Sequence, residues 1–160
     1  SLPSLMVANN FTSVSVVDKN IFISNNGGLG TDSEQVIYQM TNRSGGSIAL
    51  GDVVVFAANA DGSSVTTTTT GGDDKVFGMA LESIGNNISG SILVRGKTQS
   101  LKVDGTTDIA IGDFLTTFTT AKIAAKAAAG DMCFAIALEA YTTNDSAGVI
   151  DALLIPARLI

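Results

Sequence analysis

Histidine and tryptophan are absent from this chain of 160 residues, and cysteine occurs only once. Without histidine the chain has no Ser-His or Cys-His nucleophilic pair and lacks the commonest zinc ligand. Aromatic platforms for sugar rings are scarce, because the aromatic residues are seven Phe and two Tyr. The single Cys133 cannot form an intrachain disulfide, and its apolar neighbours predict a buried thiol of low reactivity. These absences remove most of the common catalytic classes.

Charge is scarce as well. Charged residues make up 15% of the chain, against roughly 25% in an ordinary soluble domain. The net charge is −6, and only Arg95, Lys97 and Lys102 cluster among the nine basic residues, so no nucleic-acid partner is expected. No apolar run approaches the roughly 18 residues of a membrane-spanning helix, so no membrane partner is expected. Hydrophobic residues reach 45%, and such an excess is usually covered by another protein surface, which predicts a homo-oligomer or a larger assembly.

The chain contains the same order of β elements twice. Each copy has a Gly-Asp step into an apolar run, then a Phe-x-x-Ala-Leu-Glu segment, then a glycine that opens another strand. The three pairs of segments begin at Gly51 and Gly112, Phe77 and Phe134, and Gly90 and Gly148, at offsets of 61, 57 and 58 residues. A repeated order at a nearly constant offset indicates two halves of one duplicated domain. We therefore predict an all-β fold: a small duplicated β-barrel or sandwich over residues 35–160.

Runs of β-branched and apolar residues between turn signals predict the individual strands. They are expected at residues 35–40, 48–57, 65–70, 76–83, 88–97, 98–103, 109–111, 114–119, 134–141 and 149–155. Pro156 is expected to end or interrupt the last strand, because proline cannot donate to the ladder. Residues 121–129 have high helix propensity but correspond to the threonine-rich strand of the first half, so a short helix and an extended segment both remain open.

Residues 1–46 are rich in Asn, Ser, Thr and Gly and are expected to have no counterpart in the repeat. Short strands are expected at 13–17 and 20–24, separated by a turn at Asp18-Lys19 and followed by a loop at 25–30. The glycines of this loop superficially resemble a phosphate-binding loop, but the Lys-Ser/Thr of that motif is missing and no helix follows. We expect residues 1–34 to form an N-terminal arm or an accessory β segment.

Two glutamates are the strongest candidates for chemistry. Glu82 and Glu139 are related by the repeat, and a pair of carboxylates could serve a glycosidase. Both follow an Ala-Leu pair at the end of an inward-facing strand, where alternation places the acid at the rim. A structural role is therefore expected for both, and a hydrolase using Glu82 and Glu139 is a remote alternative.

The aspartates of the chain fall in turn sequences. Asp52 and Asp113 belong to the two Gly-Asp steps and are expected to accept local backbone hydrogen bonds. Asp61, Asp73 and Asp74 could offer oxygen ligands to calcium, but no EF-hand or nonapeptide pattern accompanies them, so solvated turns are expected. We predict no catalytic, cofactor-binding or metal-binding residue and no cofactor.

The order of these motifs resembles the head decoration proteins of tailed bacteriophages, also called cement or capsid-stabilising proteins. The resemblance is closest to the small β-rich family described as having a β-tulip fold, and it covers residues 35–160. The matching positions are Gly51-Asp52, Gly78–Glu82, Val94-Arg95-Gly96, Gly112-Asp113, Ala137-Leu138-Glu139 and Gly148–Ile155. The chain departs from the family at Ala121-Lys122, where members usually have a small Gly-Lys turn.

The resemblance implies a structural virion protein that binds the outer surface of the head and stabilises the shell. It implies synthesis in the bacterial host cytoplasm, the major capsid protein as partner, and a homo-oligomer that is a trimer, with a dimer as the alternative. It implies no catalysis, no cofactor and no small-molecule substrate. A receptor- or carbohydrate-binding module of a phage tail is the main alternative to this function.

Overall fold

The computed structural model describes the backbone of residues 11–17, 20–25, 35–58 and 61–160, and side chains from residue 35 onward. The chain divides into two compact units, Ser1–Ser33 and Glu34–Ile160. In the first unit, β1 (Phe11–Val17) pairs with β2 (Asn20–Asn25) in an antiparallel manner. Both strands expected in this region are confirmed, whereas the predicted turn at Asp18-Lys19 and most of the loop at 25–30 lie outside the described residues.

The first half of the second unit is a closed ring of five strands. Its members are β3 (Val36–Asn42), β4 (Val53–Phe56), β5 (Ser64–Thr66), β6 (Val76–Ala80) and the beginning of β7 (Ser89–Val103). The pairings run β3–β5, β5–β4, β4–β6, β6–β7 and β7–β3; the first is parallel and the others are antiparallel. Because each of the five strands pairs with two others, the sheet closes into a barrel.

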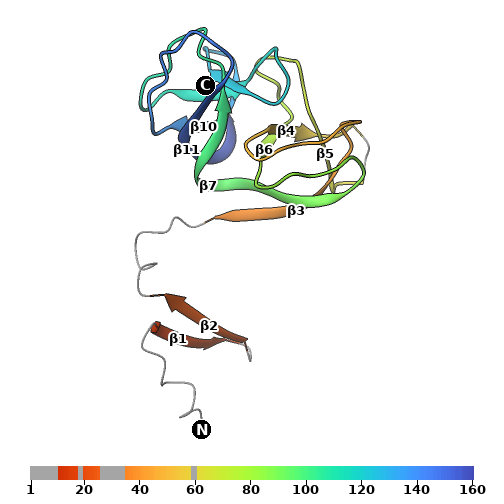
Figure 1. Ribbon diagram of the computed structural model, residues 1–160, viewed down its shortest axis with the longest axis vertical. Coiled ribbons are helices and arrows are strands. Elements are labelled where there is room, and N and C mark those ends of the chain that lie inside the picture. Colours follow the sequence, from red (N-terminus) through yellow and green to blue (C-terminus); the bar gives the residue numbers. More distant parts are fainter. Residues whose placement is uncertain (1–10, 18–19, 26–34, 59–60) are drawn as a thin grey trace. The chain divides into compact units, whose positions relative to one another are not determined.

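The second half repeats this ring and shares β7 with the first. The rest of β7 joins β8 (Phe114–Thr117), β9 (Ala124–Lys126), β10 (Met132–Ala137) and β11 (Gly148–Leu159). The pairings run β7–β9, β9–β8, β8–β10, β10–β11 and β11–β7, and again the first is parallel. Figure 1 shows the long green β7 passing from beside β3 to beside β11. The expected all-β duplicated barrel is thus confirmed as two rings joined through one strand.

The repeat extends to residues outside the strands. Ile48 forms an isolated bridge with Ile84, and Ile109 forms the matching bridge with Tyr141. Thr41 and Asn42 pair in parallel with β5, just as Val103 of β7 pairs with Ala124 of β9. β3 therefore has a counterpart in the end of β7, and the expectation that residues 35–46 lack a counterpart is wrong.

Two groups of buried side chains stabilise the rings. One belongs to the first ring alone: Met40, Ile48, Val54, Val65, Ala80, Ile84 and Ile92. The other combines first-ring residues such as Val53, Met79 and Leu93 with second-ring residues such as Leu115 and Phe134. Because successive residues of a strand face opposite ways, Val54 lies in the first core while Val53 lies in the shared one. The two rings are therefore fused by a common core.

Several strand boundaries differ from those predicted. Residues 48–52 form a bridge and a turn, so β4 starts only at Val53, and residues 109–111 contribute a bridge without a strand. The expected pair of strands at 88–97 and 98–103 is one continuous strand, β7. Residues 121–129 contain β9 and no helix, which decides between the two possibilities left open above. No helix in the described ranges is long and apolar enough to cross a membrane.

Of the two outcomes expected at Pro156, an end to the last strand is wrong, whereas an interruption of its pairing is confirmed. β11 continues to Leu159, and its register with β10 shifts between the pair Cys133–Arg158 and the pair Ala135–Leu154. Pro156 falls within this irregularity. The pairing of β11 with β7 already ends at Leu154, so the missing N–H of the proline interrupts no ladder bond there.

Candidate functional site

The Gly-Asp steps are tight turns, as expected. Gly51 and Gly112 have φ of 86° and 91°, a conformation that favours glycine. The Asp52 carboxylate accepts the N–H of Ala49, three residues earlier, at 2.8 Å. Asp113 accepts the N–H of Ala110 in the same way, also at 2.8 Å. These aspartates hold the turns that lead into β4 and β8.

Lysines neutralise both turn aspartates. The buried Asp52 lies 2.5 Å from the Nζ of Lys102 and 3.8 Å from the Nζ of Lys122. Asp113 lies 2.8 Å from the Nζ of Lys126. Burial alone would raise the pKa of Asp113, but its hydrogen bonds to Lys126 and to the Ala110 amide lower that pKa below its ordinary value. The carboxylates of both Gly-Asp steps are engaged within the fold.

The repeat-related glutamates also have structural partners. Glu82 accepts the backbone N–H of Ser91 at 2.9 Å, and Glu139 accepts the backbone N–H of Asp151 at 3.1 Å. Each therefore caps the pairing of neighbouring segments at the rim of its own ring. The structure places the two glutamates at equivalent positions of different rings and shows no bond between them.

Of the three aspartates considered for calcium, Asp61 and Asp73 serve their own turns, and Asp74 is exposed. Asp61 accepts the N–H of Ser63 and the hydroxyl of Ser64, at 3.0 Å and 2.7 Å. Asp73 accepts the hydroxyl of Thr68 at 2.6 Å and the N–H of Lys75 at 2.9 Å. In the described part of the chain, no group of three or more His, Cys, Asp or Glu side chains is placed to hold a metal ion.

Cys133 is fully buried in β10, and its Sγ lies 3.1 Å from the backbone oxygen of Arg158. Burial raises the pKa of this thiol. A raised pKa disfavours the thiolate, which is the reactive form of cysteine. The structure thus places Cys133 in the core, as its apolar neighbours predict.

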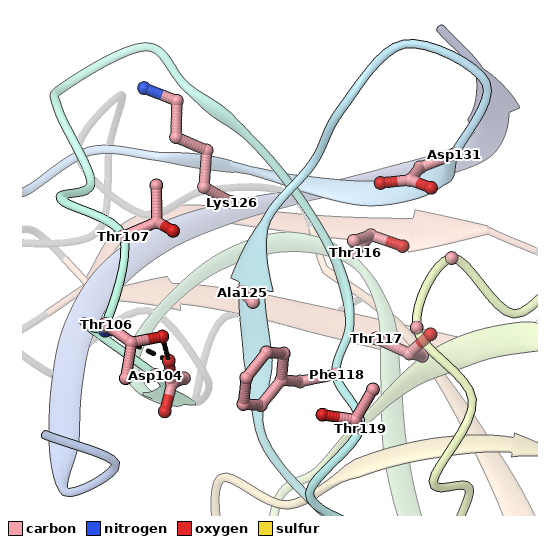
Figure 2. A pocket seen from close by; sticks show the side chains of 12 residues that line it. Asp104, Thr106, Thr107, Thr116, Thr117, Phe118, Thr119, Ala125, Lys126 and Asp131 are labelled. Carbon is pink, nitrogen blue, oxygen red and sulfur yellow. Dashed lines mark hydrogen bonds between the residues drawn. The ribbon is translucent and has the colours of Figure 1, made fainter.

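One hollow of about 290 Å³ lies between the loop at Gly71 and Gly72 and the second ring. Figure 2 shows threonines, Asp104, Lys126 and Asp131 around it. The Thr117 hydroxyl donates to the oxygen of Thr70, and the Thr116 hydroxyl donates to the oxygen of Met132.

The charged groups of this hollow are engaged too. Burial would raise the pKa of Asp104, but hydrogen bonds from Ser146 and Thr106 lower it below its ordinary value. Asp131 accepts the N–H of Ala128 at 2.7 Å, and Lys126 forms the ion pair with Asp113. Asp104, Asp131 and Lys126 thus each have a partner within the fold.

The surface of the second unit carries exposed apolar side chains, which are candidates for contacts with a partner. Large apolar side chains that are more than one-third exposed are Ile37, Tyr38, Leu50, Phe56, Ile88, Ile111, Leu138, Val149 and Leu159. Leu50 and Ile111 are related by the repeat and stand at the tips of the two Gly-Asp turns.

Three aromatic side chains gather at the first ring. Tyr38 of β3 and Phe56 of β4 are 51% and 44% exposed. The ring of Phe77, in β6, lies 5.9 Å from that of Tyr38 and 4.5 Å from that of Phe56, centroid to centroid. We call Tyr38, Phe56 and Phe77 the aromatic cluster. Phe77 also packs against the core of the first ring, so the cluster is an extension of that core to the surface.

β3 itself has one open edge. It pairs with β7 from Val36 to Thr41, but on its other edge only Thr41 and Asn42 pair, with β5. Figure 1 shows β3 at the rim of the second unit, next to β7. Within residues 35–58 and 61–160, no strand covers the remaining edge from Val36 to Met40.

Sequence reasoning missed both the open edge and the aromatic cluster. The segment 35–40 was predicted as an ordinary strand, and pairing partners cannot be read from one strand alone. A usable signal was nevertheless present, because residues 36–42 contain no charged residue and no proline. Edge strands usually carry such residues to prevent association.

Comparisons with known proteins place few limits on function. No model of a known protein family matches the chain, and no curated protein matches it. Among solved structures, the chain is similar to the head fiber gp8.5 N base of bacteriophage phi29. The TM-score is 0.49 and the identity 14%, over 79% of this chain and 99% of that chain. Because this TM-score and this sequence identity are low, the fold assignment rests on the strand pairings described above and not on the similarity to that structure.

Proposed function

We propose that this protein is a structural component of a phage head: a decoration protein that binds the outer surface of the shell and stabilises it. The proposal rests on the structural role of the Gly-Asp and Ala-Leu-Glu motifs. They resemble those of decoration proteins, and their carboxylates bind backbone amides within the two rings. The motifs thus hold turns and strand pairs of the two rings in place, which suits a structural component of a shell.

The exposed apolar side chains support a role in protein contacts. Exposed apolar groups that are gathered in one place commonly mark an interaction surface. Here Tyr38 and Phe56 gather around Phe77 at one ring. Many weak contacts of this kind, repeated over a shell, give stable attachment by avidity without one tight site.

The proposed partners are the major capsid protein and further copies of this chain. The resemblance favours a trimer, and a dimer is the alternative. We propose that residues 1–34 act as an arm along the capsid or a neighbouring subunit, since a strand added to a sheet edge binds mainly through its backbone. The proposed function includes no catalysis, cofactor, nucleic acid or small-molecule substrate.

Binding to heads tests this function. The purified protein is mixed with heads that lack it and sedimented, and we expect saturable binding to many sites per head. A variant lacking residues 1–30 is expected to keep the circular dichroism of a β protein but to bind heads more weakly. Failure of the full chain to bind heads would contradict the decoration function. Equal binding by the full chain and the shortened variant would contradict only the role proposed for residues 1–34.

Two other functions make different predictions. A tail receptor- or carbohydrate-binding module would recognise glycans on an array, although few aromatic side chains from residue 35 onward are exposed to stack on sugars. A hydrolase would lose its activity in the double variant Glu82→Gln, Glu139→Gln. The bonds of these glutamates to backbone amides favour a structural role for both.

A further inference from the structure

The open edge of β3 presents backbone groups that have no partner among residues 35–58 and 61–160. The N–H of Thr41 donates to the oxygen of Ser63 at 2.8 Å, on the side of the open edge. Because alternate residues of a strand point their N–H and C=O groups to the same edge, Ile37 and Gln39 point theirs the same way. Both residues are exposed. This edge therefore offers two N–H donors and two C=O acceptors to another strand.

Nothing in the sequence of β3 protects this edge. Natural edge strands are usually blocked by lysine, proline or a bulge. β3 contains no charged residue and no proline, and its one irregularity, between Val36 and Ile37, precedes the regular stretch from Ile37 to Thr41. An exposed, regular and neutral edge is a template for strand addition.

We propose that this edge pairs with the same edge of a second copy of the chain, antiparallel, across a two-fold axis at Tyr38. In this register Ile37 lies opposite Gln39 of the second copy, and Gln39 lies opposite Ile37. Each of these two pairs exchanges two N–H···O=C bonds, which uses all the outward-pointing groups identified above. The contact is isologous, with the same residues contributed by each copy.

The side chains suit this register. Tyr38 meets Tyr38 of the second copy at the centre, in the closer, non-hydrogen-bonded type of pair. Aromatic pairs across strands stabilise a sheet, and the contact would also cover a side chain that is 51% exposed. Phe77, 5.9 Å from Tyr38, extends this apolar contact on each copy.

Charge favours a second copy as the occupant of the edge. The chain carries a net charge of −6, which disfavours the close approach of two copies through acidic surfaces. The strand Val36–Asn42 is neutral along its whole length, and pairing it with itself brings no like charges face to face. This inference goes beyond the proposed function and does not depend on it. It favours a two-fold contact over the trimer that the resemblance implies.

The first test is cross-linking of the full chain. Cα atoms of a non-hydrogen-bonded antiparallel pair lie about 4.5 Å apart, within the range that a disulfide spans. A Tyr38→Cys variant is therefore expected to form a disulfide-linked dimer on oxidation. The matched control is Gln99→Cys, which is exposed, lies 61 residues further along the repeat and is in the middle of β7. The control is expected to stay unlinked.

The second test uses charge exchange and sedimentation velocity. The wild-type chain is expected to sediment as a dimer, and Tyr38→Lys and Tyr38→Glu are each expected to sediment as monomers. An equal mixture of the two variants is expected to restore the dimer, because opposite charges then meet at the axis.

Other occupants of the edge would give other results. A wild-type monomer or trimer, or a dimer whose Tyr38→Cys variant does not cross-link, would overturn the proposal. Failure of the mixed Tyr38→Lys and Tyr38→Glu variants to associate would also overturn the proposal. That failure is expected if a capsid strand or residues 1–34 of the same chain pairs with the edge. Circular dichroism of each variant separates loss of folding from loss of pairing.

Discussion

Asp104 accepts hydrogen bonds from the N–H and hydroxyl of Thr106 and from the hydroxyl of Ser146, the last at 2.5 Å. The side chain is 1% exposed and joins two loops of the second ring. Sequence alone could not single it out, because its partner Ser146 lies 42 residues away. The Gly-Asp carboxylates, in contrast, were predictable, since their partners lie only three residues away.

We predict that Asp104→Asn lowers the free energy of unfolding at pH 7 by about 1–3 kcal/mol, because an amide cannot accept all of these bonds. The pKa of Asp104 is lowered from its ordinary value of 3.8, so its contribution is complete above that pH. The contribution is lost as the pH falls from this value through the lower pKa of the folded protein.

Urea unfolding at a series of pH values measures this effect. The difference between wild type and Asp104→Asn is expected to be constant near neutral pH and to shrink below the ordinary pKa. The exposed Asp108 provides the control variant, Asp108→Asn, which is expected to match wild type. A difference that persists unchanged at acidic pH would contradict the role assigned to the ionised carboxylate.

At the scale of elements, the two Gly-Asp turns have the same shape but different surroundings. A Cβ at Gly51 would lie 2.1 Å from the backbone oxygen of Ser100, whereas a Cβ at Gly112 would have nothing within 4 Å. Both positions have positive φ. The repeat in the sequence predicted the shared turn, but the crowding at one copy arises from β7, which only the folded chain brings there.

We therefore predict that Gly112→Ala costs about 1–2 kcal/mol of stability, the usual penalty for a left-handed residue with a side chain. Gly51→Ala is expected to cost about 1–3 kcal/mol more, because the backbone must also move. Thermal or urea unfolding of the two variants checks the order. Equal losses, or a larger loss for Gly112→Ala, would contradict the account of these turns.

Other elements show where local sequence was insufficient. Residues 121–129 have the propensity of a helix, but β9 is extended because Ala124 pairs with Val103 and with Thr117 in the closed ring. Ring closure thus outweighs propensity, which differs by only about 1 kcal/mol or less per residue among ordinary amino acids. The open edge of β3 could not be predicted from local sequence either, since it depends on which strands lie beside β3 in the folded chain.

At the scale of the molecule, two five-stranded rings share β7 and one core. The offsets of the repeat indicated the duplication, but not that a single strand serves both copies. Leu93 and Leu115 come from different rings and belong to the same buried cluster, so the two halves support each other. Fusion of the rings through β7 and the shared core places exposed apolar side chains, such as Tyr38 and Phe56, on one continuous body.

The most direct test of the proposed decoration role is the number of copies of this protein in purified virions of the phage proposed as its source, relative to the major capsid protein. Quantitative mass spectrometry or calibrated gel staining gives this ratio. We predict copies on the order of hundreds per particle, because a decoration protein occupies repeated sites over the shell. A handful of copies per particle would place the protein at a tail or a unique vertex, and its absence from virions would contradict a structural role in the head.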